Sequence, residues 1–199
     1  MKKTILDHLY QDRLLKTAIE AVDLPESAPS SDVYGSLLRS IVSQQLSVKA
    51  AATIYGRFLD LFDQNPAPSI LLDTDVETLR SVGLSKQKSG YMHNIARFFQ
   101  ENSLKNTAWE TMSDEAIIQL LTQIKGVGVW TVQMILMFTL QREDVLPTAD
   151  LGIQQAMQQL YNIEGKGKVL IKQMETIAEP WKPYRSIACR YLWKWKDTV

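Results

Sequence analysis

The sequence predicts an all-α fold of about nine or ten short helices. Apolar residues recur at helical spacing along most of the 199 residues, and no segment alternates apolar and polar side chains as a half-buried strand does. Serine, threonine or aspartate, which favour helix N-caps, stand before many of the periodic segments. Prolines and glycines lie between these segments, where helices end.

Helices in the first half of the chain follow from this spacing. The first ends before the Ser/Pro-rich segment 23–31, and a break at residues 43–45 separates the second from the third. Ser47 is placed to cap the third helix, a capping-box sequence opens the fourth, and Ser85 is placed to cap the fifth. A polar, proline-bearing loop is expected at 63–69. The predicted helical segments are, in order, 9–19, 34–42, 47–62, 74–83 and 85–99.

The second half continues the pattern. Gly126 and Gly128 separate two apolar-periodic segments, and the turn at 145–147 leads to Asp150, where a further helix starts. Pro183 suits the first turn of the last helix. The predicted segments are 113–124, 130–140, 150–160 and 183–195.

Composition favours a folded protein without a cofactor. Apolar residues make up 45% of the chain and charged residues 22%, which is ordinary for a folded soluble protein. A single cysteine, Cys189, excludes an internal disulfide framework and an all-cysteine zinc or iron–sulfur site, and His8 and His93 leave little material for a metal site. No run of about 18 apolar residues or signal-like N-terminus is present, so no membrane contact is expected. The net charge of zero argues against a strongly basic surface but leaves phosphate binding by main-chain N–H groups open.

The glycine turn between segments 113–124 and 130–140 is the most informative part of the chain. Gly126 and Gly128 predict a tight turn with unusual backbone angles, after which the next helix begins almost at once. The first N–H groups of that helix can bind an anion, for which a DNA phosphate is the natural candidate, and Lys125 would add one local charge. A plain corner with glycines for close packing stays open as the alternative.

Four segments, in this order, resemble the helix-hairpin-helix superfamily of DNA glycosylases, in its 3-methyladenine glycosylase II branch. In that family they are the minor-groove loop, the hairpin, the loop that ends in the catalytic aspartate, and the start of the last helix. The resemblance covers roughly residues 5–196. The segments are Ile41–Ala51 (IVSQQLSVKAA), Ile124–Thr131 (IKGVGVWT), Leu146–Gly152 (LPTADLG) and Trp181–Ser186 (WKPYRS).

This resemblance implies two helical lobes with a helix-hairpin-helix motif and an active-site cleft between the lobes, all in a single domain of residues 1–199. Lobe one would span roughly 33–110, flanked by the N- and C-terminal helices, and the hairpin-containing segment roughly 113–160. The implied activity is monofunctional hydrolysis of the N-glycosidic bond of alkylated purines, such as 3-methyladenine and 7-methylguanine, in duplex DNA during base excision repair. A monomer is expected, in the cytoplasm at the nucleoid of a bacterium or in the nucleus of a eukaryote.

Asp150 is the catalytic carboxylate that the resemblance implies. Positive charge develops on the sugar as the N-glycosidic bond breaks, and a nearby carboxylate stabilises it. An alkylated purine already carries positive charge, so no second acid is needed. An aspartate before a helix is most often an N-cap, which stays open for Asp150, while Asp144 and Asp114 read as loop and first-turn charges.

The other site residues also follow from the resemblance. Trp130 and Trp193 match pocket tryptophans, whose π faces attract a flipped cationic base. Trp130 also stands where members that cut the DNA backbone place a lysine nucleophile, so lyase activity is not expected. Further candidates for the pocket wall are Tyr34, Met134, Trp181 and Tyr184.

Gln45, with Gln44 beside it, matches the wedge that fills the space of an extruded base. The phosphate-binding hairpin would comprise Lys125, Gly126, Gly128, Trp130 and Thr131, and its carbonyls can also hold a monovalent cation.

Other readings of these residues stay open. The chain can be a non-catalytic helix-hairpin-helix DNA-binding module, or a glycosylase for a neutral lesion or mismatch, which usually needs an acid catalyst. The tryptophans can be core residues and the glutamines functionless loop residues. Four lysines can contact phosphates but are more typical of a solvated surface, so they are left out of the expected site: Lys86, Lys88, Lys166 and Lys168.

Overall fold

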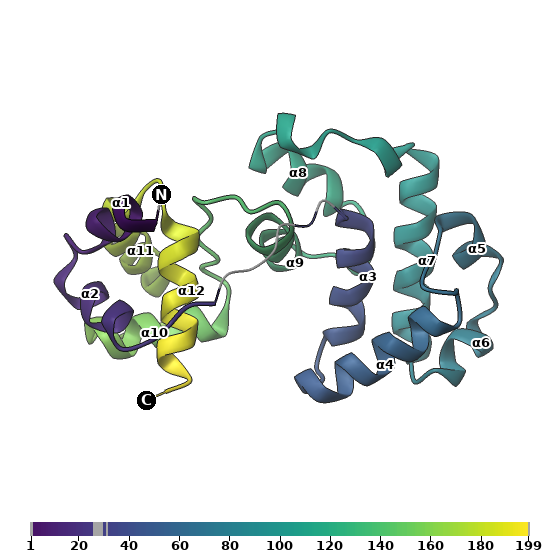
Figure 1. Cartoon of the computed structure of the whole chain (residues 1–199), viewed down its shortest axis with the longest axis horizontal. Coiled ribbons are helices and arrows are strands. Elements are labelled where there is room, and N and C mark those ends of the chain that lie inside the picture. The colour runs from purple at the N-terminus through teal and green to yellow at the C-terminus, as the bar shows by residue number, and fades with distance from the viewer. Residues whose placement is uncertain (1, 26–29, 31, 199) are drawn as a thin grey trace. The chain divides into compact units, whose positions relative to one another are not determined.

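The computed structural model describes residues 2–25, 30 and 32–198 (Figure 1). These residues form twelve α-helices, three short 3-10 helices and one π-helical segment, with no strand among them, so the all-α prediction is confirmed. The chain divides into two compact units: a central unit, residues 30–135, and a terminal unit formed by residues 1–29 and 136–199. In the described part of the chain, no helix has the length and apolar character needed to cross a membrane.

The central unit is built around one long helix, α7, against which α3, α5 and α6 pack (Figure 1). Apolar residues at helical spacing explain this packing, because α3 buries Leu37, Leu38 and Ile41 and α7 buries Met92 and Ile95. The helices of this unit are α3 (Val33–Ser43), α4 (Val48–Asp60), α5 (Pro68–Asp73), α6 (Val76–Ser81), α7 (Lys86–Glu101), α8 (Asp114–Leu121) and α9 (Val129–Met134), with 3-10 helices at Leu104–Asn106 and Trp109–Thr111.

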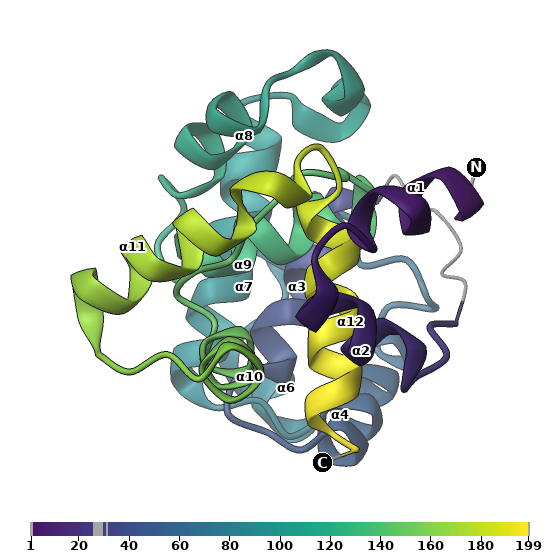
Figure 2. The same cartoon turned by 90° about the vertical axis from the view of Figure 1, so that its left-hand side faces the viewer.

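The terminal unit joins both ends of the chain. Its last helix, α12, packs against α2 and α10, as Figure 2 shows from the side of this unit. The helices are α1 (Lys2–Leu9), α2 (Arg13–Glu20), α10 (Leu151–Tyr161), α11 (Gly167–Ala178) and α12 (Arg185–Lys196), with a 3-10 helix at Glu179–Trp181.

Asp12 marks where the first predicted helix actually begins, because α2 starts at Arg13 rather than at residue 9. Its Oδ1 accepts hydrogen bonds from the N–H groups of Leu14 and Leu15 (3.0 Å each), so it is the N-cap of α2. Its Oδ2 accepts hydrogen bonds from the Tyr161 hydroxyl (2.7 Å) and the Trp181 indole N–H (2.9 Å). One aspartate thus begins α2 and ties it to distant parts of the unit.

Three helices lie where none was predicted, and the first of them, α1, precedes the predicted segment 9–19 except for Leu9. Helix α5 follows Asn65–Ala67, and its Pro68 occupies the first helical turn, where a missing N–H is harmless. Helix α11 buries Leu170, Met174 and Ala178, a spacing of four residues that is typical of a helix face.

Two predicted helices have different bounds. The helix expected at 130–140 is α9 followed by a π-helical segment, Ile135–Thr139. Pro183 lies outside the last helix, which begins at Arg185, and it follows a cis peptide bond.

Candidate active site

Asp150 and Trp193 lie together in the terminal unit. Asp150 is the N-cap of α10, and its Oδ1 accepts a hydrogen bond from the Ile153 N–H at 2.8 Å. The same oxygen accepts a hydrogen bond from the Trp193 indole N–H, also at 2.8 Å. The N-cap alternative is therefore correct for Asp150. The capping oxygen also binds Trp193, which is one of the residues predicted for the base pocket. A carboxylate is held at a half-buried position beside an aromatic ring.

Gly152 explains how the indole approaches the first turn of α10. A Cβ at Gly152 would lie 3.0 Å from both Cδ1 and Nε1 of Trp193. It would also lie 3.0 Å from Oδ1 of Asp150, so a side chain there would force the indole or the carboxylate to shift. The short sequence Asp150-Leu-Gly152 thus supplies the acid and the space that its indole partner occupies.

The loop before Asp150 is tied to the start of α12. Arg185 donates to both carboxylate oxygens of Asp144, from Nε at 2.6 Å and from Nη2 at 3.0 Å, so Asp144 is an ion-pair partner rather than a solvated loop charge. The Ser186 N–H donates to the Glu143 carbonyl, and the Ser186 hydroxyl accepts from the Val145 N–H, both at 2.9 Å. The last-helix signature therefore has a structural task, which is to fix the loop that carries Asp150.

Phe138 is a site candidate that the sequence analysis missed. It lies in the π-helical segment, is 41% exposed, and its ring centroid is 5.8 Å from that of Trp193. Segments of π-helix are frequent at functional sites because the extra residue redirects side chains. An apolar residue in a helical pattern gives no such signal, because the same pattern also fits an ordinary α-helix.

The glycine hairpin lies in the central unit, between α8 and α9. Gly126 has φ +105°, and a Cβ on it would lie 2.4–2.7 Å from the Tyr91 ring of α7. A Cβ on Gly128, the N-cap of α9, would meet nothing within 4 Å. The first glycine is therefore required by packing, while the second leaves the surface of the turn open.

The other hairpin candidates differ in exposure. Lys125 is exposed, but Thr131 is 4% exposed, so its side chain is withdrawn from any phosphate at the surface. The side chains of residues 124–129 carry no oxygen, so a monovalent cation would depend on main-chain carbonyls. At least three of these already accept hydrogen bonds: Ile124 from the Val127 N–H (3.0 Å), Lys125 from the Asn94 amide (3.1 Å) and Gly128 from the Val132 N–H (3.1 Å).

Gln44, Gln45 and Trp130 meet at one hollow of the central unit. The hollow has a volume of about 300 Å³ and is also lined by Ser40 and Ser43. Gln45 is exposed, and its backbone is in the left-handed region with φ +58°. The Trp130 side chain is 40% exposed, so it is not a core residue, and Met134 lies one turn further along α9 and is half-buried.

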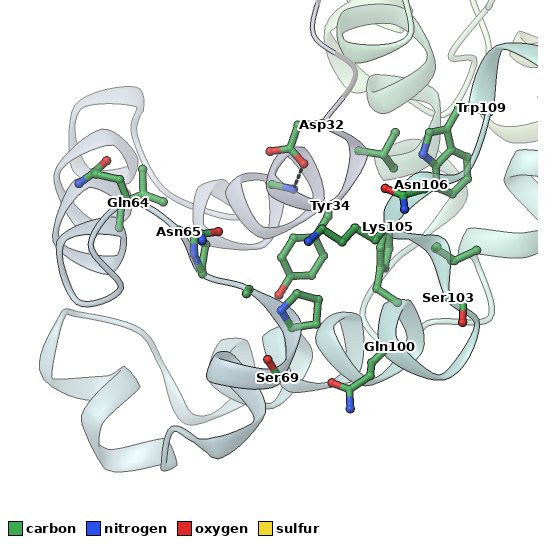
Figure 3. A pocket seen from close by; sticks show the side chains of 18 of the residues that line it. Asp32, Tyr34, Gln64, Asn65, Ser69, Gln100, Ser103, Lys105, Asn106 and Trp109 are labelled. Atoms are coloured by element: carbon green, nitrogen blue, oxygen red, sulfur yellow. Dashed lines mark hydrogen bonds between the residues drawn. The ribbon is translucent and has the colours of Figure 1, made fainter.

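Tyr34 lies in a different cavity of the central unit, drawn in Figure 3 with Asp32, Lys105 and Trp109 around it. This cavity has a volume of about 970 Å³ and shares no lining residue with the hollow at Trp130. The Tyr34 ring packs on Phe99, its hydroxyl is buried without a hydrogen-bond partner among the described residues, and burial raises the pKa of Tyr34. The structure does not bring Tyr34 together with Trp130.

Trp181 is not a pocket residue. It is 1% exposed, and its indole N–H donates to Asp12 in the core of the terminal unit. Tyr184, the N-cap of α12, packs edge-on against His8.

Among the described residues, no three His, Cys, Asp or Glu side chains gather as metal ligands would.

Comparison with known proteins gives one consistent family. Residues 38–183 match the model of the HhH-GPD superfamily base excision DNA repair protein. The alkylbase DNA glycosidase-like protein mag2 of Schizosaccharomyces pombe is 35% identical over 174 residues, covering 85% of this chain and 79% of the relative. The 3-methyladenine DNA glycosylase Mag1 of the same yeast, solved in complex with abasic DNA, is 33% identical with a TM-score of 0.79, covering 96% of this chain and 95% of that one. The DNA-3-methyladenine glycosidase of Bacillus halodurans is 39% identical, also with a TM-score of 0.79, over 96% of this chain and 88% of that one.

Proposed function

The chain belongs to the HhH-GPD superfamily of base excision DNA repair proteins, and on this premise we propose that it is a monofunctional DNA glycosylase. Its substrates are alkylated purines, 3-methyladenine and 7-methylguanine, in duplex DNA, and it acts as a monomer without a cofactor. The relatives that support this assignment are named for the same or a closely related activity.

The observation that carries this proposal is the position of Asp150. Its carboxylate accepts N–H donors from Ile153 and Trp193, and Phe138 packs on that indole. In the reaction, the bond between C1′ and the base nitrogen breaks, and the base takes the electron pair. The negative charge of Asp150 stabilises the positive sugar that forms. A water molecule then adds to C1′ and loses a proton, which leaves an abasic site.

The aromatic residues favour a cationic leaving group. An alkylated purine already bears positive charge, so it departs without a proton from an acid. Cation–π attraction, about 0.5–2 kcal/mol per ring, distinguishes such a base from a normal one. Trp193 and Phe138 provide adjacent rings in the terminal unit, and Trp130 provides an exposed ring in the central unit.

Hydrolysis without strand cleavage is expected from Trp130. This residue holds the position at which lyases of the family carry a lysine nucleophile. Formation of a Schiff base with the sugar needs an amine, which an indole does not provide.

The hairpin and the turn at residues 43–47, named here the wedge turn, are proposed to bind the DNA. The open surface at Gly128 lets a phosphate approach main-chain N–H groups at the start of α9. Lys125 adds an exposed charge, and hairpin carbonyls are the proposed place for a monovalent cation. Gln45, exposed on the wedge turn, fills the space that the extruded base leaves, with Gln44 beside it.

A panel of duplexes that each contain one defined lesion tests this function. We expect strand scission at 3-methyladenine or 7-methylguanine after alkali treatment, and none before it. Faster release of hypoxanthine or uracil would indicate a glycosylase for neutral lesions. Scission without alkali would indicate a lyase, and no scission at any lesion would indicate a non-catalytic DNA-binding module.

A further inference from the structure

Lys88 is not the solvated surface charge that the sequence suggests. It lies in the first turn of α7 and is half-buried. Its Nζ donates hydrogen bonds to the main-chain carbonyls of Val42 and Gln44, each at 2.7 Å. Partial burial lowers the pKa of Lys88 from its ordinary value.

The two acceptor carbonyls lie where α3 gives way to the wedge turn. Helix α3 ends at Ser43, and the last carbonyls of a helix lack partners within that helix. A cation at this end also interacts favourably with the helix dipole. Lys88 therefore stabilises both the end of α3 and the first residue beyond it.

The wedge turn needs such support because its backbone is strained. Gln45 has φ +58°, a left-handed conformation that residues with a Cβ seldom adopt. The apolar side chain of Leu46 in the turn is 39% exposed, and that of Val48, the first residue of α4, is 88% exposed. Strain and exposure both favour relaxation of the turn unless tertiary contacts hold it.

The same helix that holds the wedge turn also holds the hairpin. Asn94 of α7 donates to the Lys125 carbonyl at 3.1 Å, and the Tyr91 ring of α7 lies against Gly126. Lys88, Tyr91 and Asn94 follow one another at intervals of three residues, which places them along one side of the helix. Helix α7 therefore fixes the wedge turn and the hairpin relative to each other.

We propose that Lys88 is the positioning residue of the wedge: by binding the Val42 and Gln44 carbonyls, it holds Gln45 where it fills the space of an extruded base. This inference rests on the proposed glycosylase function. Its ammonium group is used within the protein and does not serve as a phosphate contact.

The test places the same lesion in two contexts: one in which extrusion of the base is costly and one in which it is easier. Single-turnover rates are measured with 3-methyladenine or 7-methylguanine opposite its normal partner, and opposite an abasic site, where less pairing is lost on extrusion. The variants are Lys88→Met, Lys88→Arg as the conservative rescue, and Lys86→Met as the matched control, since Lys86 is an exposed lysine of the same helical turn. Gln45→Ala and the double variant Gln45→Ala/Lys88→Met complete a double-mutant cycle, which measures the coupling between the two residues.

We expect Lys88→Met to slow release from the paired lesion roughly tenfold, with little change for the lesion opposite the abasic site. Lys88→Arg and Lys86→Met should stay near the wild-type rates, and the double variant should be no slower than Gln45→Ala alone. Equal slowing of both substrates, or a Lys88→Met protein that behaves as Lys86→Met, would overturn the inference. A wild-type protein that releases no base from either duplex would instead overturn the glycosylase function.

Discussion

At the scale of single residues, Asp150 combines two tasks in one carboxylate. Its Oδ1 caps α10 through the Ile153 N–H and accepts the Trp193 indole N–H. The cap fixes the side-chain rotamer, and the indole fixes the direction from which an aromatic ring approaches. An acid that must act at a defined point on a sugar gains from both constraints, because preorganised charge needs no rearrangement during the reaction.

Trp193→Phe separates the two contributions of the indole. The variant keeps an aromatic ring but loses the N–H that donates to Asp150. A hydrogen bond to a charged group contributes about 1.5–3 kcal/mol, so kcat should fall by about tenfold or more, while KM changes less. Measured single-turnover and steady-state rates on one alkylated duplex check this, and an unchanged kcat would rule out a positioning role for the indole N–H.

Residue roles were predictable where they depend on neighbours in the sequence. Gly126 was identified from its spacing to Gly128, and its φ of +105° is what such a turn requires. The bonds of Lys88 to Gln44 and of Trp193 to Asp150 join residues more than forty positions apart. Local patterns carry no information on such pairs, so the sequence alone does not distinguish Lys88 from a surface charge.

At the scale of elements, the hairpin uses its two glycines differently. Gly126 needs a positive φ and lies against Tyr91, whereas Gly128 has φ −98° and open space around a would-be Cβ. Gly126 is therefore needed for folding, whereas Gly128 is expected to be needed for contact with DNA.

Matched alanine variants test this division of roles. Gly126→Ala should lower the free energy of unfolding by about 2–4 kcal/mol, because it adds backbone strain and overpacks the Tyr91 ring. Gly128→Ala should change stability by less than about 1 kcal/mol but weaken binding to duplex DNA. Thermal or urea unfolding and a DNA titration measure the two effects. Equal stability of the two variants, or full DNA affinity of Gly128→Ala, would contradict these roles.

Helices with a clear apolar stripe were predictable, and those without one were not. The predicted segments 34–42, 47–62 and 85–99 correspond to α3, α4 and α7. Helix α5 is short and begins in a proline-rich stretch, which reads as a loop until Pro68 is seen in the first turn. The π-helical segment 135–139 has an apolar pattern that also fits an α-helix, and tertiary packing decides between the two.

At the scale of the whole molecule, the formal net charge is zero, with 22 basic and 22 acidic residues. Long-range attraction to DNA therefore contributes little, and affinity must come from local contacts at the hairpin and the wedge turn. The division into two units was less accessible from sequence, because the terminal unit joins both chain ends through contacts such as Trp181 with Asp12.

Salt dependence tests this picture of binding. The logarithm of the binding constant falls linearly with the logarithm of the salt concentration. The slope is about −0.9 for each phosphate that a cationic side chain neutralises. We expect a slope shallower than about −6 for duplex DNA, as measured by fluorescence anisotropy between low and physiological salt. A steeper slope would mean that an extended cationic surface dominates, which the charge composition does not suggest.

The central claim is that the charge of Asp150 drives base release, and Asp150→Asn tests it most directly. Asparagine is also a good N-cap and retains an oxygen that can accept the Ile153 and Trp193 N–H groups, so the fold should persist while the charge is lost. We predict that single-turnover release of 3-methyladenine or 7-methylguanine falls by at least about a hundredfold, with affinity for abasic DNA retained. Release at the wild-type rate by this variant would contradict the account.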